Sequence, residues 1–235
     1  MKSMSQTTGA GRTRKGGETK ERIVDCALRK FRQYGYDGTT MRGIAEDAGV
    51  SLGNAYYYFK SKDHLITAYY RESHETHIEA CEPILDGEKN LKKRLLGVLR
   101  TRVETSMPYH RFSMQLFKTA ADPESPLSPF SDEQTEVRDL SVDIFRRVID
   151  GSSTKVSGKL ATELPMLLWT YQMGIILYWV HDRSQGCSQT YKLIDHSTDL
   201  VVRLIQLNRL PPMRPLVNRT LKLLADLKPL RTNGA

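Results

Sequence analysis

Apolar residues recur every three or four positions along most of the chain, with polar residues between them. No segment shows a convincing alternation of apolar and polar residues, the pattern expected of a half-buried strand. The sequence therefore predicts an all-α protein. Apart from two short helices on either side of Gly49, helices are expected at residues 18–34, 62–81, 90–105, 109–121, 132–149, 162–181, 189–207 and 216–227.

Two features of the chain after Lys62 add to this prediction. Pro83 is expected to end the helix that begins at Lys62, because proline removes a backbone donor and clashes with the preceding turn. The helix at 162–181 is apolar nearly all round, which predicts a central, buried position. Its apolar run, from Leu164 to Val180, is shorter than a membrane span requires.

The segment between Thr39 and Lys62 has the local signals of a helix-turn-helix. Thr40 and Ser51 are good N-cap residues, and Gly49 sits where a helix must end with a positive φ. A small, aromatic and basic surface is expected on the second helix. The apolar stripes of the two helices consist of Ile44, Ala45 and Ala48, and of Ala55, Tyr58 and Phe59.

An ordered set of residues extends this motif in both directions. It comprises Arg22-Ile23, Ala27, Phe31, Gly35-Tyr36, Thr39-Thr40, Ile44-Ala45, Ala48-Gly49-Val50-Ser51, Gly53, Tyr56, Tyr58-Phe59, Ser61-Lys62 and Leu65. This pattern resembles the signature of the tetracycline-repressor (TetR) family of bacterial transcriptional regulators. The resemblance covers residues 18–66, and no departure from the family pattern occurs there.

The resemblance implies a three-helix DNA-binding domain at residues 18–66, followed by a larger helical domain at 67–235 for ligand binding and dimerisation. The basic residues 1–17 before them are expected to form a disordered tail. The implied DNA-binding residues are Thr40, Arg42, Ser51, Leu52, Gly53, Asn54, Tyr56, Tyr57, Lys60 and Lys62.

The chemistry of these residues suits recognition of duplex DNA. Gly53 permits close approach to the major groove, and the amide of Asn54 can pair with adenine. Tyr57 can contact phosphate through its hydroxyl and thymine methyl groups through its ring. Lys60 and Lys62 can hold backbone phosphates.

The excess of basic over acidic residues is concentrated where this motif lies. Residues 1–62 contain 12 Lys or Arg and 6 Asp or Glu, whereas the remaining 173 residues contain 23 and 21. A basic segment can be merely a solvated surface, but its coincidence with the motif favours a footprint for phosphate. The stretch Arg12-Thr13-Arg14-Lys15 could enter a minor groove, although a solvated tail is favoured.

The cysteines and the N-terminus bear on the cellular compartment. Cys26, Cys81 and Cys187 are few and scattered, which suits a reducing environment better than a disulfide framework. The N-terminus lacks the apolar stretch of a secretory signal. A cytoplasmic protein is therefore expected.

The family resemblance implies a homodimer that binds a palindromic operator and is released from it by a small-molecule effector. The helices at 162–181 and 189–207 are the expected interface, packed as a four-helix bundle. A hydrophobic or aromatic effector is expected, because large polarizable side chains recur in the body and 165–180 carries no charged residue. For any single one of these side chains ordinary core is the favoured alternative, and the ligand is expected to contact some of the candidate residues Phe112, Leu116, Trp169, Tyr171, Met173 and Tyr178.

Two other classes of function stay open at this point. His74, His77 and Cys81 share one helix face and could bind zinc in a metal sensor, but three ligands on one helix rarely converge. A partly buried, hydrogen-bonded face is favoured, and neither a metal nor a cofactor is expected. An enzyme acting on an apolar substrate ranks lowest, because the sequence has no nucleophile elbow or phosphate loop.

Overall fold

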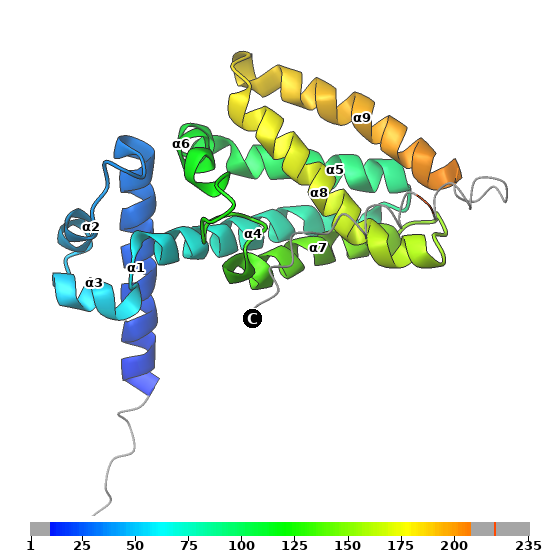
Figure 1. Cartoon of the computed structure of the whole chain (residues 1–235). Helices are drawn as coiled ribbons and strands as arrows, with labels where there is room; N and C mark the ends of the chain where they lie inside the picture. Colours follow the sequence, from blue (N-terminus) through cyan, green and yellow to red (C-terminus); the bar gives the residue numbers. More distant parts are fainter. Residues whose placement is uncertain (1–9, 208–218, 220–235) are drawn as a thin grey trace, which may run out of the picture. The chain divides into compact units, whose positions relative to one another are not determined.

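A computed structural model describes residues 10–207 and Arg219, with the backbone alone for residues 10–16. Every regular element within this part is helical and none is a strand, so the all-α prediction is confirmed (Figure 1). The helix expected at 216–227 lies, except for Arg219, outside the described residues. None of the described helices has the length and apolar character needed to cross a membrane.

The chain divides into two compact units, one that ends at Tyr70 and one that begins at Arg71. We call them the N-terminal unit and the C-terminal unit. The N-terminal unit contains α1 (Ala10–Tyr34), α2 (Met41–Asp47), α3 (Leu52–Tyr58) and the first turns of α4 (Lys62–Gly87). Its buried apolar side chains include Ile23, Ala27, Phe31, Ile44, Ala45, Ala48, Ala55, Phe59 and Leu65.

The first helix is longer than the sequence pattern predicts. α1 begins at Ala10 and not at Glu18, so residues 10–17, expected to be disordered, are helical. Adding turns to an existing helix is much easier than starting one, and arginine and lysine are good helix formers. Composition alone was therefore a poor guide to order in this segment.

Up to residue 207, the C-terminal unit contains the rest of α4 and five further α-helices (Figure 1). Short 3₁₀ turns precede three of them: η1 (Met107–Tyr109), η2 (Asp132–Gln134) and η3 (Gln185–Cys187). The helices are α5 (Leu91–Ser106), α6 (His110–Ala120), α7 (Thr135–Asp150), α8 (Lys159–His181) and α9 (Ser188–Leu207).

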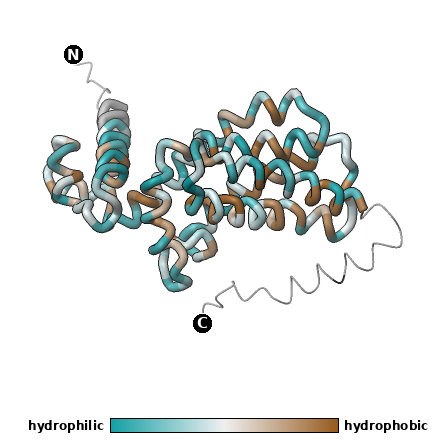
Figure 2. The backbone as a smooth tube through the Cα atoms, turned by 90° about the horizontal axis from the view of Figure 1, so that it is seen from above, coloured by the Kyte–Doolittle hydropathy of each residue, from teal (hydrophilic) through white to brown (hydrophobic). Residues whose placement is uncertain are grey.

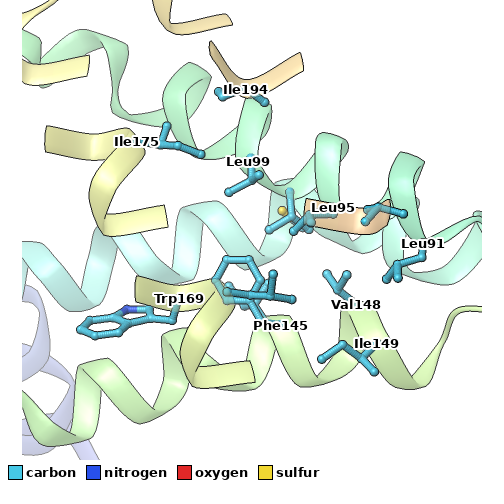
Figure 3. Close-up of a cluster of buried hydrophobic side chains, with 14 of the residues drawn as sticks. Leu91, Leu95, Leu99, Phe145, Val148, Ile149, Trp169, Ile175 and Ile194 are labelled. Atoms are coloured by element: carbon cyan, nitrogen blue, oxygen red, sulfur yellow. The ribbon is translucent and has the colours of Figure 1, made fainter. Parts of the chain in front are cut away.

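The core of the C-terminal unit lies among α5, α7, α8 and α9, whose apolar stretches alternate with hydrophilic ones along the chain (Figure 2). α8 packs against α5, α6, α7 and α9, so its central position is confirmed. The prediction that α8 is buried on all its sides is wrong, because Leu177 and Tyr178 are exposed. Figure 3 shows the core contributed by Leu91, Leu95, Leu99, Phe145, Val148, Ile149, Trp169, Ile175 and Ile194.

Pro83 does not end α4, as the sequence pattern predicted, because the helix continues to Gly87. The turn beyond the proline is held by contacts that the sequence pattern does not reveal. Leu85 is buried in the core, and its carbonyl oxygen accepts a hydrogen bond of 2.6 Å from Nη1 of Arg94. Tertiary packing thus outweighs the loss of one backbone hydrogen bond.

Arg94, only 1% exposed, joins three helices at one point. Its guanidinium donates to the carbonyl oxygens of Leu85 and Glu88 at the end of α4, each at 2.6 Å. It also donates to those of Arg147 (2.6 Å) and Val148 (2.9 Å) in the last turn of α7. These carbonyls carry the partial negative charge of two helix C-termini, which stabilises the buried cation.

Arg94→Met should lower the free energy of unfolding by roughly 3–5 kcal/mol, because the buried carbonyls would lose their donors. Urea denaturation of the full chain measures this change. Lys93→Met is the matched control, since Lys93 is exposed next to it, and should cost less than about 0.5 kcal/mol. Equal stability of Arg94→Met and Lys93→Met would contradict this role for Arg94.

The turn between α8 and α9 is held by the buried carboxylate of Asp182. Its Oδ1 accepts from the backbone N–H of Ser184 (2.9 Å) and from the Ser184 hydroxyl (2.6 Å). Its Oδ2 accepts from the backbone N–H of Thr190 (2.8 Å) and from the Thr190 hydroxyl (2.7 Å). Burial alone would raise the pKa of Asp182, but these hydrogen bonds lower it to about 2.

Asp182 should make the protein sensitive to acid in a defined range. Because its folded pKa of about 2 lies below the value of about 4 in an unfolded chain, its stabilisation is complete above about pH 4. That stabilisation is lost as the pH falls through 4 toward 2. The free energy of unfolding of Asp182→Asn should therefore fall less than that of the wild type over this range. An unchanged pH profile in Asp182→Asn, measured beside the exposed control Asp150→Asn, would refute the assignment.

Candidate DNA interface

The turn between α2 and α3 has the cap geometry that the sequence predicts. The Thr40 hydroxyl accepts from the backbone N–H of Gly43, and the Ser51 hydroxyl from that of Asn54, both at 3.1 Å. Gly49 has a φ of +63°, a conformation that glycine adopts without a Cβ clash. The backbone N–H of Val50 then donates to the Ala45 carbonyl oxygen at 3.0 Å, which closes the turn.

One face of α3 anchors the helix inside the N-terminal unit. Ala55 is fully buried, and Phe59 after the helix is 3% exposed. Tyr58, expected in the core, is only partly buried, and its ring meets the Tyr57 ring edge-on with centroids 5.2 Å apart. The opposite face of the helix therefore remains on the surface.

Most of the ten candidate DNA-binding residues lie on this surface. Leu52 and Lys62 are partly buried, and Tyr57, at 81%, is the most exposed of the large apolar and aromatic side chains of the described chain. Apart from the neighbouring residues and backbone of its own helix, no described atom lies within 4 Å of the position that a Cβ on Gly53 would occupy, so packing does not require glycine there. The exposed candidates are Thr40, Arg42, Ser51, Gly53, Asn54, Tyr56, Tyr57 and Lys60.

Lys62 differs from the other candidates because its ammonium group is engaged within the N-terminal unit. It donates to the Tyr36 carbonyl oxygen at 2.8 Å and lies 4.2 Å from the centroid of the Tyr36 ring. The Tyr36 hydroxyl in turn donates to the Asp63 carboxylate. Lys62 thus fixes the start of α4 to the segment after α1, and a phosphate role suits Arg42 and Lys60 better.

Two basic residues of α1 also act inside the unit, which sequence reasoning missed. Arg22 Nε donates to the carbonyl oxygen of Ala48 at the end of α2, at 2.9 Å. Lys30 forms an ion pair of 3.0 Å with Asp47. Part of the basic excess of this segment therefore positions α2 and is not a footprint for phosphate.

The six candidate ligand-binding residues differ in burial. Phe112, Leu116 and Trp169 are buried, whereas Tyr178 is 45% exposed and so points away from the interior. The Tyr171 hydroxyl joins α8 to α9 through hydrogen bonds to Ser197 (2.5 Å) and Thr198 (3.2 Å). Met173 is partly buried against the core.

A groove of about 750 Å³ lies elsewhere in the C-terminal unit, between α4 and α7. It shares no residue with the candidate ligand set, and it is bordered by charged side chains. Arg71 pairs with Glu136 at 2.7 Å, and Arg147 pairs with Glu82 through contacts of 2.6 and 2.9 Å. Its lining includes His74, Ile78, Glu136, Leu140, Val142 and Arg147.

Two buried polar atoms on α8 were missed by sequence reasoning. Oε1 of Gln172 and Nε1 of Trp179 have no hydrogen-bond partner among the described residues, although the two residues are only 3% and 2% exposed. They are seven residues apart and so lie on one face of the helix, a spacing visible in the sequence. Such atoms suit a ligand that offers one donor and one acceptor.

His74, His77 and Cys81 form a buried, hydrogen-bonded face, as favoured from the sequence. The His77 ring nitrogen Nε2 lies 2.9 Å from the Val98 carbonyl oxygen, and burial lowers the pKa of His77 to about 3. Burial raises the pKa of the Cys81 thiol to about 12, so it stays protonated. Within the described residues, no three His, Cys, Asp or Glu side chains are grouped to hold a metal.

Comparison with known proteins extends these observations to both units. Residues 23–69 match the profile described as bacterial regulatory proteins, tetR family. Residues 94–223 match the profile described as the C-terminal domain of tetracyclin repressor-like proteins.

Individual relatives agree with these profiles. The uncharacterized HTH-type transcriptional regulator YhgD of Bacillus subtilis is 30% identical over 109 residues, which are 45% of this chain and 54% of YhgD. The HTH-type transcriptional regulator RutR of Escherichia coli is 45% identical over 67 residues, 28% of this chain and 31% of RutR. The chain thus spans about half or less of the length of these curated relatives.

Solved structures share the fold. The TetR transcriptional regulator from Nitrosomonas europaea has a TM-score of 0.60 at 16% sequence identity. The match covers 78% of this chain and 97% of that protein.

Proposed function

Because this chain belongs to the TetR family of bacterial transcriptional regulators, which are DNA-binding proteins, we propose that it is a repressor. In this proposal a homodimer binds a palindromic operator and leaves it when a small molecule binds the C-terminal unit. The observation that carries the proposal is the exposed face of α3, with Tyr57 at 81% exposure beside a glycine that packing does not require.

The exposed face of α3 supplies groups for both parts of duplex recognition. Asn54 and Tyr57 would reach base edges in the major groove, and Gly53 would let the helix approach closely. Arg42 near the start of α2 and Lys60 after α3 would hold phosphates on either side. Their exposure supports these roles, since neither is buried in the unit.

Tyr57→Ala should weaken binding to a duplex selected by the wild-type protein from a random library, by about 1–3 kcal/mol. Tyr34→Ala is the matched control, because Tyr34 is 54% exposed in the same unit but on α1. Lys60→Ala should weaken selected and scrambled duplexes alike and reduce the salt dependence by about one counterion. Fluorescence anisotropy titrations at several salt concentrations measure both effects. Unchanged affinity in Tyr57→Ala and Lys60→Ala would sink the assignment of this face.

The exposed faces of α8 and α9 support the proposed dimer. One side of α9 is ion-paired to α5, through Lys92 to Asp199 (2.6 Å) and Arg100 to Asp195 (2.6 Å). The other side exposes leucines, and one face of α8 exposes Leu177, Tyr178 and Gly174. A second copy would cover this apolar surface, whose exposed α9 members are Leu200, Leu204 and Leu207.

The position of Gly174 fits such packing. It is exposed in the middle of α8, and, apart from its chain neighbours and the nearby backbone of α8, no described atom lies within 4 Å of the position that a Cβ would occupy there. Glycine costs about 1 kcal/mol relative to alanine in a helix interior, so a close helix partner would account for it. A symmetric dimer would bring two such helices together.

Leu204→Glu should convert the dimer to monomers, because two charges would be buried without partners in the interface. Gln206→Glu is the control, since it adds the same charge to an exposed position on another side of α9. Light scattering after gel filtration at micromolar concentration distinguishes the two states. A monomeric wild type, or a dimeric Leu204→Glu, would contradict this interface.

The effector is proposed to be a largely apolar or aromatic molecule bound in the C-terminal unit. The buried side chains of Phe112, Leu116 and Trp169 support an apolar ligand, and the unpartnered atoms of Gln172 and Trp179 suit a polar group on it. Differential affinity for two arrangements of the dimer would release DNA by a population shift. A coupling of about 1–3 kcal/mol is typical of such control.

A further inference from the structure

Three side chains with soft or borderline metal-binding atoms meet where α6 begins and the turn between α8 and α9 ends. Sγ of Cys187 lies 4.0 Å from Sδ of Met107 and 4.0 Å from Nε2 of His110. Met107 opens η1, His110 is the first residue of α6, and Cys187 closes η3. Sequence patterns do not reveal this set, because Cys187 is far from the other two residues along the chain.

The two separations from Cys187 are close to those around a three-coordinate ion. At an angle of about 120°, two sulfur atoms each about 2.3 Å from an ion are about 4.0 Å apart, and a sulfur and an imidazole nitrogen, at about 2.3 and 2.0 Å, are about 3.7 Å apart. A small movement of side chains would therefore admit an ion between the thiol, the thioether and the imidazole. We propose that Cys187, Met107 and His110 bind a single Cu(I) ion.

Ligand softness and charge favour Cu(I) over Zn²⁺ at this position. A thioether is a soft ligand that selects Cu(I), and a thiolate with Cu(I) forms a neutral pair. Zn²⁺ is typically held in proteins by thiolate, imidazole and carboxylate ligands, and the thioether of Met107 is not one of these.

A buried N–H group next to Cys187 is a second observation that favours a metal-bound thiolate there. Nε1 of Trp179 is buried, and the Cys187 thiol, a weak acceptor, is the group that faces its N–H. A metal-bound thiolate would be a stronger acceptor for the Trp179 N–H.

Binding of Cu(I) exchanges the proton of the Cys187 thiol for the metal ion and involves no electron transfer. Cu(I) forms a bond to Sγ of Cys187, and the thiol proton passes to the solvent. His110 joins in the tautomer protonated on Nδ1, and its Nε2 gives up the contact of 2.7 Å with the Trp179 carbonyl oxygen. Because the His110 and Trp179 rings are 4.8 Å apart, the ion would lie near a fluorescent reporter.

Competition with bicinchoninate under anaerobic, reducing conditions tests the proposal on the full chain. The wild type should take one Cu(I) per chain, and Cys187→Ser should lower the affinity at least about tenfold. Met107→Leu, which keeps the volume but removes the thioether, should also weaken binding. Cys81→Ser is the matched control, as a buried cysteine on α4, and should bind as the wild type does.

Fluorescence of Trp179 tests whether the ion binds at this position. The chain has two tryptophans, so Trp169→Phe leaves Trp179 as the only one, and Cu(I) should quench its fluorescence at one equivalent. Thermal melts of the metal-free variants separate loss of the site from loss of the fold. Binding abolished by Cys81→Ser but unaffected by Cys187→Ser would overturn the proposal. So would tighter binding of Zn²⁺ than of Cu(I), or the absence of quenching.

Discussion

The guanidinium of Arg94 lies where the last turns of α4 and α7 meet the first turn of α5, and it donates to four main-chain carbonyl oxygens. A cation in that place is stabilised by the partial negative charge of two helix C-termini. The site is also sterically tight, because a Cβ on Gly151 would come within 2.1 Å of Nη2. The end of α7 therefore has to be glycine for the arginine to fit.

Arg94 fixes the position of α5, and α5 in turn determines which side of α9 faces the C-terminal unit. Lys92 and Arg100 flank Arg94 on α5 and bind Asp199 and Asp195 of α9. These ion pairs are exposed and contribute little stability each, but they orient one side of α9 toward its own unit. The leucines on the other side are left facing outward, which is why a surface for a second copy is available.

Local signals predicted the helix-turn-helix well because its geometry is set by neighbours in sequence. The caps at Thr40 and Ser51, the positive φ of Gly49 and the burial of Ala55 were all readable from residue type and spacing. Contacts between distant residues were not readable. No pattern in the sequence indicated that Arg22, Lys30 and Lys62 each bind a partner elsewhere in the N-terminal unit.

Contacts between distant residues also explain why two predictions for the C-terminal unit were wrong. Helicity past Pro83 depends on Leu85 and Arg94, and the exposed position of Tyr178 depends on which side of α8 meets α7 and α9. Neither follows from helical periodicity alone. The unpartnered atoms of Gln172 and Trp179 could have been placed on one face from their spacing, but their lack of partners among the described residues required the structure.

Hydroxyl-radical footprinting of the wild-type protein on the DNA upstream of its own gene tests the central claim most directly. Two α3 helices related by a two-fold axis should protect two symmetric patches whose centres are about one helical turn, or a multiple of it, apart. Such a paired pattern, lost at high salt, is the predicted result. A single patch, or uniform protection without sequence preference, would contradict recognition of an operator by a symmetric dimer.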